Sequence, residues 1–175
     1  MSKASLKKEL KSLTKEEIID VVLELYDARK EAKEYLEFFL NPNEDGEKEK
    51  CKSIIFNEFY PKRGEPKTRF SVCRKAISDF KKLKPSPDTL ADLMLFYIET
   101  GVRFTRDYGD MWEQYYDSLA GNFEKALEHI SKSCDFELYK DRIHKVLADS
   151  DCCGWGFSDS LWWGYEKYFE VEDDE

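Results

Sequence analysis

The residues best suited to catalysis in this 175-residue sequence are acidic side chains spaced along residues 107–117. Carboxylates about one helical turn apart can hold Mg²⁺ or exchange protons with a substrate if they face a cleft. Met111, Trp112 and Tyr115 lie between them and should take the buried side of the helix, which leaves most of the carboxylates in solvent. A carboxylate-dependent, metal-assisted enzyme is therefore one alternative, built on Asp107, Asp110, Glu113 and Asp117.

Other sets of metal donors are incomplete. Residues 41–46 look like the first half of a calcium loop, but Lys52 stands where that loop needs a bidentate glutamate. A zinc site would need two tightly spaced pairs of ligands, and the available side chains supply no second pair: His129, Cys134, His144 and Cys152. We expect no cofactor, no metal and no assignable catalytic residue.

A basic segment at residues 61–84 is the strongest local departure from average composition. It holds nine lysines or arginines against two carboxylates, a net charge of +7 in a chain whose net charge is −9. Such a segment binds an anion or an acidic partner, or it complements acidic helices of the same molecule. The overall negative charge disfavours nucleic acid as a partner. The candidate binding residues are Lys62, Arg63, Lys67, Arg69, Arg74 and Lys75.

Aromatic residues are concentrated near the C-terminus, with seven of them between residues 155 and 169. One interpretation is a terminal helix held against the core, because aromatic side chains bury the largest area per residue. The other is an aromatic interaction surface formed by Trp155, Trp162 and Trp163. Neighbouring tryptophans cannot point the same way on a helix, so at least one of Trp162 and Trp163 is expected to line a groove or an interface.

The cysteines and the N-terminal residues indicate the compartment. The five cysteines include no C-x-x-C pair, and reduced thiols are expected. Cys152 and Cys153 are either two unreactive thiols at a turn or a redox or soft-metal site. The N-terminal MSKASLKKELKSL lacks the apolar core of a secretory signal, and no apolar run approaches the roughly 18 residues of a membrane span. We therefore expect a cytoplasmic protein without a membrane segment.

The elements that must position these residues are all expected to be helices. Apolar residues recur at helical spacing in almost every segment, and no segment shows sustained strand alternation. Thr14 and Glu17 form a predicted capping box before one long helix over residues 15–40. Ser86 and Pro87 mark the start of another helix, which Gly101 is expected to kink or split.

Short connections imply antiparallel neighbours, so the predicted fold is all-α. It is an irregular, solenoid-like stack of antiparallel helical hairpins with seven or eight helices. We expect a single domain over residues 1–170, followed by an acidic tail at residues 171–175.

The stretch LKKELKSLTKEEII, followed by ELYDARKEAKEYLEFFLNPN, resembles the N-terminal signature of a bacterial family of uncharacterised proteins classed as a domain of unknown function. The resemblance implies a small cytoplasmic helical protein and brings no catalytic residue with it. The leading functional prediction is therefore a non-enzymatic protein-interaction or scaffold module with a protein or peptide partner. An anion or nucleic-acid binder through residues 61–84 and the carboxylate-dependent enzyme are the alternatives.

Overall fold

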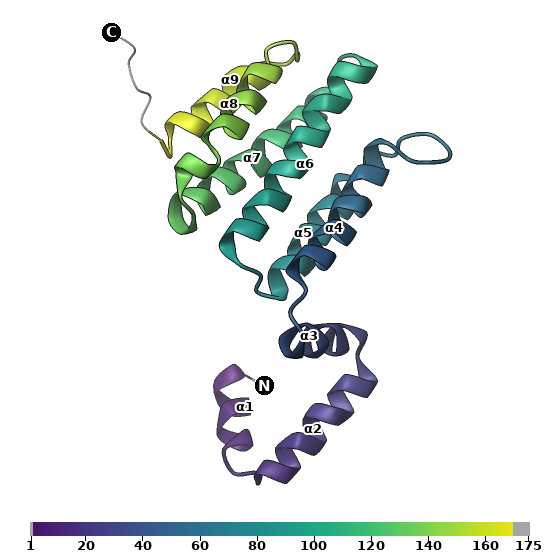
Figure 1. Cartoon of the computed structure of the whole chain (residues 1–175), viewed down its shortest axis with the longest axis vertical. Coiled ribbons are helices and arrows are strands. Elements are labelled where there is room, and N and C mark those ends of the chain that lie inside the picture. Colours follow the sequence, from purple (N-terminus) through teal and green to yellow (C-terminus); the bar gives the residue numbers. More distant parts are fainter. Residues whose placement is uncertain (1, 170–175) are drawn as a thin grey trace. The chain divides into compact units, whose positions relative to one another are not determined.

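The computed structural model describes residues 2–169, and the chain divides into two compact units, Met1–Asn43 and Glu44–Glu175. The described residues form nine α-helices and one short 3₁₀ helix, without a strand, so the all-α prediction is confirmed (Figure 1). The single domain expected over residues 1–170 stays a prediction. The acidic tail at residues 171–175 lies outside the described residues.

The second unit is a stack of three helical hairpins, α4 with α5, α6 with α7, and α8 with α9 (Figure 1). Helices α4, α6 and α8 form one layer, in which α6 contacts both neighbours, and α7 contacts α9 in the other layer. This is the predicted stack of helical hairpins. The bounds are α4 Glu44–Phe59, α5 Phe70–Lys82, α6 Pro87–Tyr108, α7 Glu113–Ser133, 3₁₀ helix Phe136–Leu138, α8 Lys140–Asp149 and α9 Phe157–Glu166.

Aromatic side chains dominate the first part of the core. Phe59 of α4 is fully buried and lies edge-on to Phe104 of α6, with ring centroids 5.6 Å apart. Phe70 at the start of α5 meets Tyr115 of α7 at 5.0 Å, again edge-on. Such pairs stabilise beyond the area they bury, so these four helices are fixed against one another at this end of the stack.

Helices α6 and α7 approach closely at Gly101. A Cβ placed there would lie 2.7 Å from both Cδ atoms of the buried Leu119. The hydroxyl of Tyr115 also donates to the Gly101 carbonyl at 2.8 Å. The expectation that Gly101 splits the helix is wrong, because α6 runs unbroken from Pro87 to Tyr108, while a kink there stays a prediction. The glycine instead provides the space in which α7 packs.

Gly101→Ala is expected to destabilise the protein by about 1 kcal/mol, because overpacking costs about 1–3 kcal/mol and the gain in helix propensity returns about 1 kcal/mol. Gly121→Ala on α7 is the matched control, since nothing lies within 4 Å of its Cβ position, and there the propensity gain stands alone. Urea unfolding followed by circular dichroism measures both. A shift of both variants in the same direction would contradict the close approach at Gly101.

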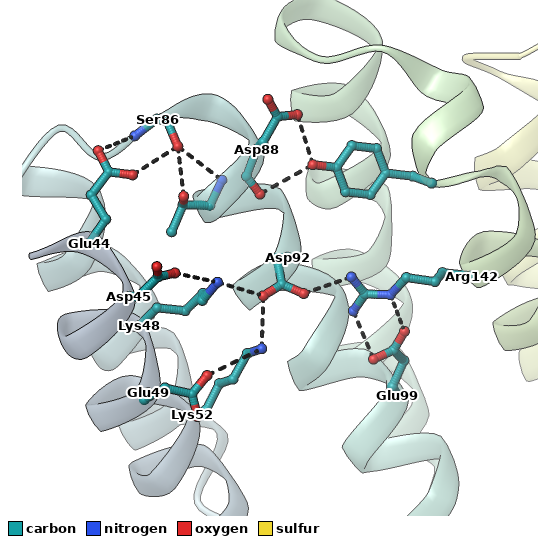
Figure 2. A network of polar contacts seen from close by, with 12 residues as sticks. Glu44, Asp45, Lys48, Glu49, Lys52, Ser86, Asp88, Asp92, Glu99 and Arg142 are labelled. Carbon is teal, nitrogen blue, oxygen red and sulfur yellow. Dashed lines mark hydrogen bonds and ion pairs between the residues drawn. The ribbon is translucent and has the colours of Figure 1, made fainter.

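A polar network ties the three helices of one layer together (Figure 2). Asp92 of α6 accepts from Lys52 of α4 at 2.8 Å and from Arg142 of α8 at 2.7 Å, and Lys48 of α4 lies 3.3 Å away. The Arg142 guanidinium also donates two hydrogen bonds to the Glu99 carboxylate, at 2.8 and 3.0 Å. One carboxylate on α6 therefore links α4 with α8.

The predicted helix start at Ser86 and Pro87 is confirmed. The Ser86 Oγ accepts from the Thr89 backbone N–H at 3.3 Å, and Pro87 occupies the first helical position. Glu44 accepts from both the backbone N–H and the hydroxyl of Ser86, at 3.0 and 2.8 Å (Figure 2). The start of α4 is thereby fixed to the start of α6.

The first unit consists of α1 (Lys3–Leu10), α2 (Lys15–Ala28) and α3 (Lys30–Leu40). The capping box of Thr14 and Glu17 is present. The prediction of one helix over residues 15–40 is wrong, because the backbone at Arg29 is extended, with φ −137° and ψ 118°. The break lets α3 fold back on α2, where the Tyr26 hydroxyl donates to Glu37 at 2.8 Å.

Among residues 2–169, no helix combines the length and the apolar character needed to cross a membrane.

Candidate functional site

A cavity of about 460 Å³ lies between α5, α6 and α7. Its volume falls in the range of small-ligand sites, about 300–1,000 Å³. Helix α5 lines it with Arg74, Ile77, Ser78 and Lys81; α6 lines it with Met94 and Tyr97; α7 lines it with Asn122, Lys125, Glu128, His129, Lys132 and Ser133.

Helical spacing places these side chains on one face of each flanking helix. The α5 residues follow one another at intervals of three, one and three, and the α7 residues recur every three or four positions. Residues at that spacing share a face. The opposite face of each helix enters the core, through Cys73, Ala76 and Phe80 on α5 and through Phe123, Ala126, Leu127 and Ile130 on α7.

The cavity is cationic. It contains four cationic side chains and one carboxylate, Glu128. Lys132 pairs with Glu128 at 2.5 Å and, as the main cause, lowers the pKa of that carboxyl below its ordinary value. The other three cations, Arg74, Lys81 and Lys125, form no ion pair within the part of the chain that the structure describes. Positive charge at this site is therefore available to a ligand.

Arg74 is oriented across the helices by a neutral partner. Its Nη1 donates to the Ser118 Oγ of α7 at 2.9 Å. Asn122 in turn donates from Nδ2 to the Ser118 carbonyl at 2.6 Å. Because Ser118 carries no charge, this contact positions the guanidinium without neutralising it.

Tyr97 adds an unsatisfied hydroxyl to the cavity. The residue is fully buried, and its hydroxyl has no hydrogen-bond partner among residues 2–169. Burial raises the pKa of Tyr97, an effect that nearby Ser118 partly opposes, so the hydroxyl stays protonated and able to donate. A buried unpaired hydroxyl costs about 1–3 kcal/mol.

His129 is held by the start of α6. Its Nε2 lies 2.9 Å from the Pro87 carbonyl, which can only accept, so Nε2 carries the proton and donates. This contact fixes the orientation of the imidazole in the cavity wall. From the sequence, His129 was considered only as one ligand of an incomplete zinc site. Together the lining residues offer hydrogen-bond donors and positive charge, which suits a bound anion.

The six basic residues singled out from the sequence do not gather at one place. Only Arg74 lines the cavity, joined there by Lys81 of the same segment. Lys62, Arg63 and Lys67 are exposed on the connection between α4 and α5. The Arg69 Nη2 and Nε donate to the buried Glu58 at 2.7 and 2.9 Å, and Lys75 pairs with Asp79. For the five residues outside the cavity, a role in anion binding stays a prediction.

The opposite cationic wall was missed in the sequence. Lys125, His129 and Lys132 lie on one face of α7, and that spacing was visible. Their charges are embedded in an acidic part of the chain, so a count of net charge conceals them. Tyr97 carries no sequence signal at all, because its missing partner is a property of the packed structure.

The three tryptophans of the predicted aromatic surface lie in different surroundings. Trp155 is exposed, and its Nε1 donates to the Met111 carbonyl at 3.0 Å. Trp162 lies edge-on to Tyr165 at 5.9 Å. Trp163 is 75% exposed and lines a smaller hollow of about 280 Å³ between α7 and α9. A shared aromatic interaction surface stays a prediction.

Two of the four carboxylates at residues 107–117, Asp107 and Asp110, accept hydrogen bonds. Asp107 accepts from the Tyr60 hydroxyl at 2.7 Å and pairs with Arg103. Asp110 accepts from the Tyr116 hydroxyl and from the Gly154 backbone N–H. Within the described residues, no group of three or more histidine, cysteine, aspartate or glutamate side chains is arranged to hold a metal ion. These contacts give Asp107 and Asp110 structural partners, and a catalytic role for the acidic segment stays a prediction.

All five cysteines are unpaired thiols. Burial is the main cause that raises the pKa of Cys153 to about 12, and the neighbouring Cys152 adds to it. The Cys153 thiol is therefore protonated at neutral pH, which favours the interpretation of an unreactive turn over a redox site.

A model of protein families, described as a family of unknown function (DUF6155), matches residues 1–163 of the chain. No curated protein and no solved structure matches it.

Proposed function

Because the chain belongs to the family of unknown function DUF6155, we propose a function from the site alone: a non-enzymatic interaction module that binds an acidic segment of a partner protein. The observation that carries the proposal is the cavity between α5, α6 and α7, where Arg74, Lys81 and Lys125 form no ion pair with a carboxylate of residues 2–169. Carboxylates of the ligand would complete these ion pairs, and one of them would accept from the Tyr97 hydroxyl once binding displaces the side chains that now cover it.

The charge of the whole molecule favours a short acidic peptide over nucleic acid. A long polyanion needs a continuous basic surface, whereas this chain has a net charge of −9 and the cavity holds three of its unpaired cations, Arg74, Lys81 and Lys125. A peptide with a few carboxylates gains from the cavity and extends little into the acidic surroundings. The unpaired thiols suit a reducing compartment, and we place the module in the cytoplasm.

Charge reversal at the cavity tests the proposal. We expect Lys81→Glu with Lys125→Glu to weaken binding of a fluorescent glutamate-rich peptide at least about tenfold, because like charges then face the ligand. Lys62→Glu with Arg63→Glu makes the same change in net charge on the exposed connection before α5 and serves as the matched control. Fluorescence anisotropy at about 50 and about 200 mM salt measures both, and the peptide should bind more weakly at the higher concentration.

Equal weakening by the two double variants would show diffuse attraction in place of a site, and absence of binding by the wild-type protein would remove the proposal. Tyr97→Phe sharpens the test. Loss of an unpaired buried hydroxyl is expected to stabilise the free protein by about 1 kcal/mol, while the peptide loses a donor and binds more weakly. A hydroxyl with only a structural role would change stability and leave peptide binding unchanged.

A further inference from the structure

The first unit, residues 1–43, leaves its apolar side chains uncovered. None of its three helices contains a buried residue. Nine large apolar side chains within it are exposed, namely Leu6, Leu13, Ile19, Val21, Val22, Leu23, Leu25, Phe39 and Leu40. A segment of this size without a fully buried side chain has little core of its own, and chains near 40 residues usually need an additional source of stability.

Helix α2 is the centre of this uncovered surface. Its acidic residues Asp20, Glu24 and Asp27 recur every three or four positions and occupy one stripe. Apolar residues fill most of the remaining circumference, and a helix of that kind is normally covered on more than one side. Helix α3 packs against α2 near Tyr26, yet Leu23 and Leu25 stay about half exposed. The apolar surface of α2 therefore needs a second covering element.

The exposed area fits a dimer interface. Nine side chains that each expose on the order of 80 Å² leave roughly 700 Å² of apolar surface per copy, against about 800 Å² per partner in a standard protein interface. The unit thus has enough apolar surface for one stable interface.

The two parts of this unit carry opposite net charges. Residues 1–15 contain five lysines and one glutamate, whereas residues 16–43 contain eight carboxylates and three cations. In a two-fold dimer the same surface occurs on both copies, so the lysines of α1 in one copy can face the carboxylates of α2 in the other, twice over. We propose that a second copy of this chain covers α2, and that the protein is a homodimer through residues 3–40.

Oligomeric state tests this inference independently of peptide binding. Light scattering after size exclusion should give twice the chain mass of 20.7 kDa. Ile19→Glu with Leu23→Glu should raise the dimer dissociation constant at least about tenfold, because both side chains would be buried only in the dimer. Leu138→Glu, at a more exposed apolar position of the second unit, is the control and should remain dimeric.

A charge exchange identifies the covering element. Lys7→Glu with Lys8→Glu should weaken the dimer, and Asp20→Lys with Glu24→Lys in the partner copy should restore a mixed dimer. A monomer at about 200 µM would overturn the proposal. Hydrogen exchange would then show what covers α2: protected amides would mean that another part of the same chain covers it, and unprotected amides would mean that nothing does. Failure here leaves the peptide-binding proposal intact, since that proposal depends only on α5, α6 and α7.

Discussion

Arg69→Met is expected to destabilise the protein by about 3 kcal/mol at pH 7, because it leaves the buried Glu58 carboxylate without its cation. Glu58 is 4% exposed and accepts from the Arg69 Nε and Nη2 at 2.9 and 2.7 Å. Arg69 itself is about half exposed, which puts the loss at the lower end of the range for broken buried pairs. Urea unfolding of the wild-type and variant proteins gives the difference directly.

The pH dependence of this destabilisation shows whether it comes from the unpaired Glu58 carboxylate or from lost packing of the Arg69 side chain. The Arg69 hydrogen bonds hold the pKa of Glu58 below its ordinary value, so in the wild type this stabilisation is complete above the unfolded pKa of about 4.3 and is lost as pH falls through the folded pKa. In Arg69→Met, burial raises the pKa of Glu58 instead. Protonation then relieves the variant, and its deficit should shrink between pH 7 and about pH 5.

Two further variants control this prediction. Arg69→Lys keeps the charge but loses the two-point contact and should fall between wild type and Arg69→Met. Glu58→Gln combined with Arg69→Met removes the buried charge and should recover part of the loss. A deficit for Arg69→Met below about 1 kcal/mol that does not change with pH would contradict the proposed role of the pair.

Asp92→Asn is expected to cost about 2 kcal/mol at neutral pH. Burial opposes ionisation of Asp92, but hydrogen bonds from Lys52 and Arg142 overcome it and lower the pKa of Asp92 to about 2. The carboxylate therefore contributes stability above its unfolded pKa of about 3.9, and this contribution is lost as pH falls toward 2. The difference between wild type and variant should disappear across the same range, measured by urea unfolding at intervals of pH.

Asp79→Asn is the matched control for Asp92. Asp79 also contacts two lysines, Lys75 and Lys82, but all three lie on α5, where the lysines are largely exposed and Asp79 is about half exposed. Pairs of this kind contribute less than about 0.5 kcal/mol. If the two variants lose equal stability, the linkage of α4, α6 and α8 through Asp92 does not contribute more than an ordinary surface pair.

Local sequence signals predicted most of the helices. The capping box at Thr14 and the Ser86-Pro87 start depend on residues within four positions of one another, and both were found where expected. The break at Arg29 was not predictable in this way. Neither glycine nor proline marks it, and its extended backbone is compensated by contacts between α2 and α3 that exist only after the chain has turned.

The candidate site shows a similar division. The basic segment was correctly identified as unusual, but the direction of each side chain depends on partners far along the chain. Arg69 turns to Glu58, while Arg74 reaches Ser118, 44 residues away. Lys125 joins the cavity only because the hairpins stack in order and bring α7 beside α5. Net charge along the sequence cannot report which helix faces meet.

The stacking order of the hairpins also bears on how the chain folds while it is being synthesised. Helices α4, α6 and α8 begin at Glu44, Pro87 and Lys140, so each hairpin is complete before the next one leaves the ribosome. At about 5–20 residues per second, roughly 50 residues take several seconds to make, whereas helical proteins with local contacts fold in microseconds to milliseconds. Each nascent hairpin therefore has time to pack on the previous one, and within the second unit the apolar faces that form the core are exposed only at the growing end.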